Sequence, residues 1–170
     1  MLPLPRRLIV SLVLVLLTAS LAAQDRKSAG QTFKPFRYKS IEGAQTALPD
    51  LLGKLTLVVF FYPTCQYCNV ALPEIQKLYD TYREQGLATV WINVVPEQNG
   101  QLAQWRSRHN YSAPILLGGR AAQNTYSVAM TPTHYLLDGD GRVLVRQEGF
   151  KAGDEKELER QIRDALVPKL

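Results

Sequence analysis

The feature that most constrains this chain is a run of large apolar residues that ends at a proline and is followed by two closely spaced cysteines. The run is Leu55-Thr-Leu-Val-Val-Phe-Phe-Tyr62, and Pro63 ends it. A short run of this kind, rich in β-branched and aromatic residues, is typical of a buried strand. Cys65 and Cys68 follow, and apolar residues then recur at intervals of three and four over residues 65–84, which predicts a helix. The chain is therefore expected to pass from a buried strand, through the cysteines, into a helix.

This position gives the two cysteines a definite chemistry. Unsatisfied backbone N–H groups and the helix dipole favour an anion at a helix N-terminus, so a thiol there has a lowered pKa. Cys68 lies about one turn beyond Cys65, so the two sulfurs can face the same side and close a disulfide. We expect Cys65, at the exposed tip, to attack a substrate disulfide and Cys68, deeper in the helix, to resolve the mixed disulfide.

Two other interpretations of the cysteine pair are open. A zinc half-site would need two more ligands, and only His109 and His134 remain as histidines. Two inert buried cysteines are the other possibility, although the position between a strand and a helix start argues against inertness.

The rest of the chain alternates predicted strands and helices. Asp138-Gly-Asp-Gly141 is a turn signature that joins the last two strands as an antiparallel hairpin. The resulting order, β-α-β-α-β-α-β-β-α, predicts an α/β fold in which a mixed central sheet is covered by helices on both faces. The further strands are expected at 87–95, 115–117, 133–137 and 142–147, and the further helices at 101–109, 121–126 and 155–166.

Composition and charge exclude several classes of protein. The chain has 170 residues, a formal net charge of +5 and two cysteines. Two cysteines exclude a framework of structural disulfides. The basic residues are scattered and form no run interleaved with aromatics, so the sequence indicates a mixed-charge surface and no nucleic-acid partner.

The first residues have the pattern of a targeting segment. Arg6 and Arg7 precede an apolar stretch, residues 8–17, and small residues follow it. This pattern predicts a signal peptide over residues 1–23, with an uncleaved membrane anchor as the alternative. Residues 24–35 are polar at their start and are expected to form a flexible lead-in, and residues 36–170 to form the domain. Export to the bacterial periplasm, or to the outer face of the cytoplasmic membrane, is the corresponding prediction.

Two motifs resemble those of the thioredoxin superfamily, and more narrowly those of the bacterial membrane-facing thiol–disulfide reductases often called TlpA/ResA-like. The first runs from the buried strand through Cys65-Gln-Tyr-Cys68 to Leu72-Pro-Glu-Ile75, with Pro73 at the position of the family's helix proline. The second is Met130-Thr-Pro-Thr133, in which Pro132 matches the family's cis-proline beside the disulfide. The resemblance covers roughly residues 36–166 and implies a thioredoxin-like three-layer sandwich.

The resemblance also implies an activity and a set of site residues. It implies a thiol–disulfide oxidoreductase that acts on protein disulfides, needs no cofactor and is kept reduced by a membrane electron donor. The sequence departs from the thioredoxin pattern at Val59, because the buried acid six residues before the first cysteine is absent. The expected catalytic residues are Cys65, Cys68 and Pro132, and the expected substrate-binding residues are Thr131, Pro63 and Thr64.

Two alternative functions remain at this stage. A peroxiredoxin-type peroxidase would place a proline and a threonine well upstream of its cysteine, whereas here Pro63 and Thr64 directly precede Cys65. A copper-delivery protein on the same fold could use two thiolates and the imidazole of His134. Such proteins space their cysteines by three residues, and the simpler interpretation of His134 is a strand residue packed at the sheet surface.

Overall fold

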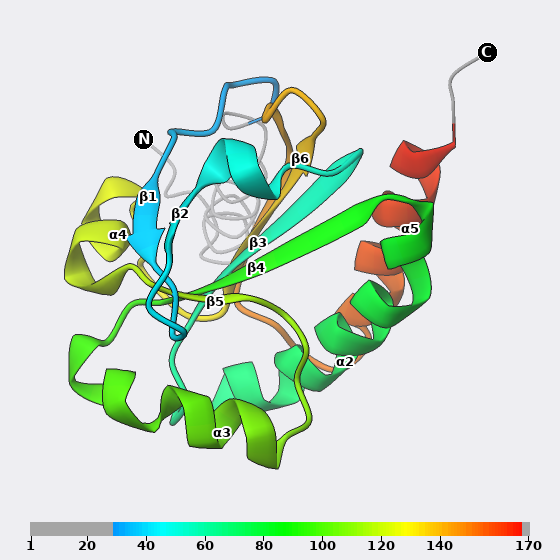
Figure 1. Ribbon diagram of the computed structural model, residues 1–170. Coiled ribbons are helices and arrows are strands. Elements are labelled where there is room, and N and C mark those ends of the chain that lie inside the picture. Colours follow the sequence, from blue (N-terminus) through cyan, green and yellow to red (C-terminus); the bar gives the residue numbers. More distant parts are fainter. Residues whose placement is uncertain (1–28, 168–170) are drawn as a thin grey trace, which may run out of the picture.

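The computed structural model describes residues 29–167, and its centre is a five-stranded mixed sheet (Figure 1). In spatial order the strands are β5 (Ile115–Leu117), β4 (Leu87–Asn93), β3 (Leu55–Phe61), β6 (Thr133–Asp138) and β7 (Val143–Glu148). β3 pairs in parallel with β4, and β4 with β5, whereas β6 is antiparallel to both β3 and β7. The predicted mixed sheet is confirmed.

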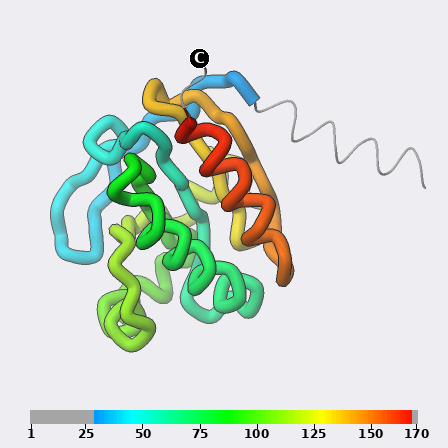
Figure 2. The backbone as a smooth tube through the Cα atoms, turned by 90° about the vertical axis from the view of Figure 1, so that its right-hand side faces the viewer, coloured from blue at the N-terminus to red at the C-terminus, as the bar shows by residue number. Residues whose placement is uncertain are grey.

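Helices cover both faces of the sheet, as predicted. α2 (Gln66–Tyr82), α3 (Leu102–Arg108) and α5 (Asp154–Leu166) contribute buried side chains to the apolar cluster on one face. α4 (Gly119–Thr125) and the short 3-10 helix η1 (Leu48–Leu51) pack into the cluster on the other. Figure 2 shows α2 and α5 side by side on their face. The thioredoxin-like three-layer arrangement is thereby confirmed.

The middle strand explains why the sheet has two apolar faces. Every residue of β3 is buried, and successive side chains of a strand point to opposite faces. Leu57, Val59 and Phe61 therefore belong to the cluster under α2, α3 and α5, whereas Val58 and Phe60 belong to the cluster under α4. A strand buried on both faces needs the continuous apolar run that the sequence contains.

Element boundaries differ from the predicted ones at several helix ends. α2 ends at Tyr82 and passes into a 3-10 helix, η2 (Arg83–Gln85), which Gly86 terminates in the left-handed conformation at φ 113°. A second 3-10 helix, η3 (Pro96–Gln101), which the sequence did not indicate, precedes α3. A short antiparallel pair, β1 (Arg37–Lys39) and β2 (Gln45–Ala47), lies before β3.

The segment before Phe36 packs against the domain. Phe33 is buried, and the backbone N–H of Gly30 donates to the carbonyl of Val143 at 2.7 Å. The aromatic side chain of Phe33 thus belongs to the cluster under α4, three residues before the start that the sequence predicts for the domain.

The predicted signal peptide, residues 1–23, lies outside the described residues. No helix within residues 29–167 combines the length and apolarity that a membrane crossing requires.

Candidate functional site

The two cysteines lie where the middle strand passes into the longest described helix. They form a disulfide in which Cys65 is the N-cap residue of α2 and the Cα atoms are 5.1 Å apart. The backbone N–H of Cys68 donates to Cys65 Sγ at 3.1 Å. Cys65 is 3% exposed and Cys68 is fully buried. The predicted order of accessibility holds, although the tip carrying Cys65 is less exposed than the sequence suggested.

This geometry suits a reactive sulfur at Cys65 when the pair is reduced. A thiolate there would keep the hydrogen bond from the Cys68 N–H and would lie at the positive end of the α2 dipole. Both interactions stabilise the anion relative to the thiol, so they favour thiolate chemistry near neutral pH. Cys68, inside the helix and away from solvent, receives no comparable stabilisation from the helix terminus.

The loop before β6 lies against the disulfide. Thr131 Oγ1 donates to Cys65 Sγ at 3.3 Å, and the same sulfur is 3.5 Å from the Thr131 carbonyl oxygen. The Thr131–Pro132 peptide bond is cis, and Pro132 is buried. The structure thus brings together residues that are more than sixty positions apart in the chain, as the second sequence motif implied.

Pro63 and Thr64 differ in their environments. Pro63 is buried beneath the loop that leads to Cys65, whereas Thr64 is exposed beside it. Gln98 of η3 holds Thr64 through two hydrogen bonds: Nε2 donates to Thr64 Oγ1 at 2.9 Å, and Oε1 accepts from the Thr64 N–H at 3.3 Å. No sequence pattern points to Gln98, because it lies outside both motifs and reaches Thr64 only in the fold.

Two shallow grooves flank the disulfide. One, of about 550 Å³, is lined by Cys65, Thr64 and Val95 among others, and the second, of about 570 Å³, by Phe150 and Lys151 among others. Tyr67, Met130 and Thr131 border both grooves. The Tyr67 and Met130 side chains are 64% and 52% exposed. Exposed apolar side chains gathered at one place are typical of a surface that contacts another protein.

His134 is a fully buried polar residue of the central sheet. It lies in β6 and is fully buried, and neither ring nitrogen has a hydrogen-bond partner. Burial lowers the pKa of the imidazole to about 4, against the opposing effect of the Asp154 carboxylate. The expectation of a residue packed at the sheet surface therefore understates how completely His134 is enclosed.

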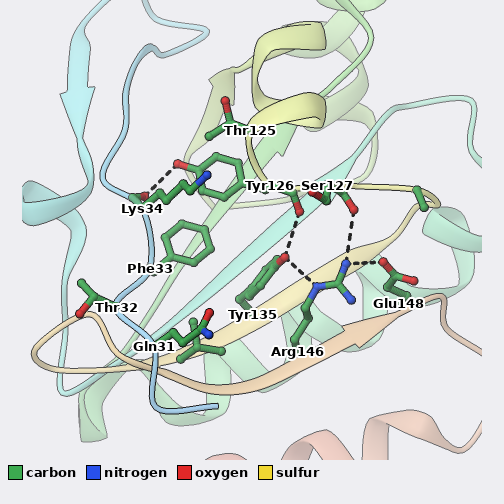
Figure 3. A pocket seen from close by; sticks show the side chains of 12 residues that line it. Gln31, Thr32, Phe33, Lys34, Thr125, Tyr126, Ser127, Tyr135, Arg146 and Glu148 are labelled. Atoms are coloured by element: carbon green, nitrogen blue, oxygen red, sulfur yellow. Dashed lines mark hydrogen bonds and ion pairs between the residues drawn. The ribbon is translucent and has the colours of Figure 1, made fainter. Parts of the chain in front are cut away.

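A further hollow (Figure 3) is lined by Phe33, Tyr126 and Tyr135 among others, which belong to the cluster on the face of the sheet opposite the cysteines. The Arg146 guanidinium donates hydrogen bonds there to the Tyr135 hydroxyl at 2.8 Å, to the Ser127 carbonyl at 3.4 Å and to the Glu148 carboxylate. The Tyr126 hydroxyl donates to the Lys34 carbonyl at 2.9 Å. These contacts join β7, the segment after α4 and the segment before β1, so the hollow is a structural junction.

Known proteins share this fold and this arrangement of the site. A helix that starts at a cysteine pair after the middle strand of such a sheet, with a cis-prolyl loop against the first sulfur, characterises thioredoxin-like proteins. The thioredoxin domain of a thiol-disulfide oxidoreductase from Bacteroides vulgatus superposes with a TM-score of 0.70 at 16% identity, covering 82% of this chain and 98% of that chain. The chain belongs to the AhpC/TSA family, whose model matches residues 29–146.

Individual relatives carry related names. "Thiol-disulfide oxidoreductase ResA" of Bacillus cereus is 26% identical over 137 residues, covering 80% of this chain and 79% of that protein. "Thioredoxin-like protein YneN" of Bacillus subtilis is 27% identical over 135 residues, covering 78% of each. The crystal structure of StoA from Bacillus subtilis matches with a TM-score of 0.62 at 25% identity, covering 76% of this chain and 96% of that one.

Proposed function

We propose that this protein is an exported thiol–disulfide oxidoreductase that reduces disulfides in other proteins through Cys65 and Cys68. The observation that carries the proposal is the cysteine disulfide at the N-cap of α2, with Cys65 Sγ in contact with Thr131. A sulfur in this position can exist as a thiolate near neutral pH, and a second sulfur one turn away can resolve the mixed disulfide.

The two roles follow from accessibility. Cys65 lines one of the grooves, so its thiolate is the sulfur that an incoming disulfide meets. Cys68 is fully buried and can reach only Cys65 Sγ, so it releases the reduced substrate. Thr131 and Thr64 border the groove and would contact the substrate chain, and Pro132 would fix the backbone beside the sulfur. Pro63 would act beneath the surface, by holding the loop that carries Cys65.

Protein substrates are supported by the surface around the sulfur. Tyr67 and Met130 would cover an extended polypeptide more readily than a small polar thiol, because their exposed area is mainly apolar. The names of the Bacillus relatives support disulfide chemistry, and the leader pattern of residues 1–23 supports export. A membrane protein that returns electrons to the cysteine pair completes the cycle of an exported reductant.

The two alternative functions have less support. A copper-delivery role would need His134 and both sulfurs to converge, and residues 29–167 contain no group of three or more metal-ligating side chains arranged to hold an ion. A peroxidase would need a peroxide held by proline and threonine at a distance from the cysteine. Here Thr64 is adjacent to Cys65 and turned toward Gln98.

The reduction potential of the Cys65–Cys68 couple tests the proposal. The oxidised and reduced forms are separated after equilibration of the protein with glutathione and dithiothreitol buffers. We expect a two-electron couple at or below about −250 mV, the range of cellular reductants. A value near about −120 mV would make the protein an oxidant. A chain that forms no intramolecular disulfide, or that consumes hydrogen peroxide faster than it reduces disulfides, would contradict the proposal.

A further inference from the structure

We propose that His134 is an internal proton acceptor for Cys68, the residue through which the buried thiol loses its proton before it resolves the mixed disulfide. This inference rests on the proposed function, because it assigns one step of that reaction. The reaction needs such a group, since only a thiolate attacks a disulfide and Cys68 is shielded from solvent.

The sheet register brings His134 to the cysteine side of the fold. His134 in β6 lies directly opposite Val59 in β3. Side chains of residues directly opposite in an antiparallel pair lie on the same face, with Cβ atoms about 5 Å apart. Val59 belongs to the apolar cluster that contains Cys65 and Cys68. His134 therefore lies under the same helices as the disulfide, three residues beyond Thr131, which touches Cys65 Sγ.

Among the described residues, none forms a hydrogen bond with the imidazole of His134. Both ring nitrogens are buried without a hydrogen-bond partner. Its neighbour across the β6–β7 pair, Gln147, uses its side-chain N–H group on Asp154 at 3.1 Å. A buried polar group without a partner costs about 1–3 kcal/mol, and buried polar groups in folded proteins are normally satisfied. An apolar side chain would fill this position without that cost, so packing alone does not explain a histidine here.

The charges around His134 are few. The residues of β3 on this face are apolar, namely Leu55, Leu57, Val59 and Phe61, and on β7 Gln147 is uncharged. α5 contributes Asp154 at its start, whose negative charge raises the imidazole pKa against the larger effect of burial. α2 packs on this side of the sheet with Cys68 among its buried residues, and the next buried residues of the helix, Ala71 and Leu72, carry no charge.

Reduction of the disulfide changes this balance. In the oxidised protein neither sulfur carries charge, and the pKa of His134, about 4, leaves the imidazole neutral at pH 7. In the reduced protein the α2 terminus favours a thiolate at Cys65, and a negative charge on the same side of the sheet raises the imidazole pKa. When the proton passes from Cys68 to His134, the thiolate and the imidazolium that form attract each other in this low-dielectric region, which favours the transfer. The proton affinity of His134 and the redox state of the cysteines are therefore coupled.

During reduction of a substrate disulfide, the proton of Cys68 passes to His134 before Cys68 attacks. The Cys65 thiolate attacks a substrate disulfide, forms a Cys65–substrate bond and expels one substrate thiolate. In the reduced enzyme Cys68 Sγ is not bonded to Cys65 and is free to rotate, and its proton passes to a ring nitrogen of His134, directly or through one water molecule. Cys68 then attacks Cys65 Sγ, the Cys65–substrate bond breaks and the second substrate thiolate leaves. The dithiol loses two electrons, the substrate disulfide gains them, and the substrate thiolates take one proton from solvent and one from the imidazolium.

His134→Gln tests the step, because glutamine is polar and of similar size but does not titrate in this range. The mixed disulfide of Cys65 with glutathione is prepared in each protein, and the first-order release of glutathione by Cys68 is followed from pH 5 to pH 9. We expect His134→Gln to slow release at least tenfold at pH 7, a threshold that lies below the roughly 10²–10⁴-fold typical of general-base catalysis. The first attack by Cys65 should keep its rate. His109→Gln is the matched control and should behave as wild type, since His109 is an exposed residue at the end of α3 whose ring stacks on Tyr111.

A second measurement needs no variant in the site. Imidazole titrations by NMR in the oxidised and reduced wild-type protein should give a higher pKa for His134 in the reduced form, with His109→Gln providing the assignment. Equal values in the two redox forms, or a release rate and pH profile in His134→Gln that superimpose on wild type, would overturn the role of His134. If the wild-type protein reduced no disulfide at all, the proposed function would fail instead, so the two failures are distinguishable.

Discussion

Lowering the pH should destabilise the oxidised protein through His134. The unfolded chain binds a proton at this histidine near pH 6.5, whereas burial holds the folded pKa at about 4. Between these values the unfolded state binds more protons than the folded state, so the free energy of unfolding falls as the pH falls from 6.5 to 4. At 1.36 kcal/mol for each pH unit, the difference between 6.5 and about 4 corresponds to a loss of about 3 kcal/mol.

Urea unfolding of oxidised wild type and of His134→Leu, at intervals from pH 7.5 to pH 4, measures this loss. The carboxylates that titrate in the same range are common to both proteins, so the difference between the two curves isolates the histidine. Leucine cannot be protonated, and we expect the difference in unfolding free energy to be constant above pH 6.5 and to shift in favour of the variant below it. Two curves that stay parallel down to pH 4 would refute a buried, neutral His134.

Two further predictions concern the opposite face and the groove. Phe33→Ala removes a buried ring that stacks on Tyr126, with 4.7 Å between ring centroids, and should lower the free energy of unfolding by about 3 kcal/mol in urea unfolding while disulfide reduction is kept. A loss below 1 kcal/mol would show that the segment before Phe36 contributes little. Met130→Ala should raise KM for a protein disulfide severalfold and leave the reduction of a small disulfide unchanged, because its exposed side chain borders both grooves and lies outside the cysteine pair. Equal effects on both substrates would argue against a polypeptide-binding surface.

Local patterns in the sequence were sufficient for the scaffold of the site. The apolar run of β3 and the helical spacing after Cys65 each report on their own segment, so the strand, the helix and the disulfide between Cys65 and Cys68 could be predicted. The contact of the loop at Pro132 with Cys65 was predictable only through a family resemblance, because no local pattern links segments so far apart in the chain.

The features that the sequence did not predict all depend on long-range packing. Gln98 is an unremarkable polar residue until η3 brings it to Thr64. Phe33 follows a polar stretch, and its burial depends on aromatic partners nearly a hundred residues further along the chain. The isolation of His134 is likewise set by its neighbours, since a histidine in an apolar strand can equally face solvent or a partner. Side-chain environment at these positions is a property of the assembled sheet and helices.

Mass spectrometry of the adduct formed by reduced Cys68→Ser with a peptide disulfide would test the division of labour between the two cysteines. The assignment of Cys65 as nucleophile and Cys68 as resolving thiol predicts a stable mixed disulfide that maps to Cys65 in this variant. The matched Cys65→Ser variant should form little adduct, because its remaining sulfur is fully buried. An adduct that forms equally in both variants, or that forms in Cys65→Ser alone, would contradict the proposed chemistry of the site.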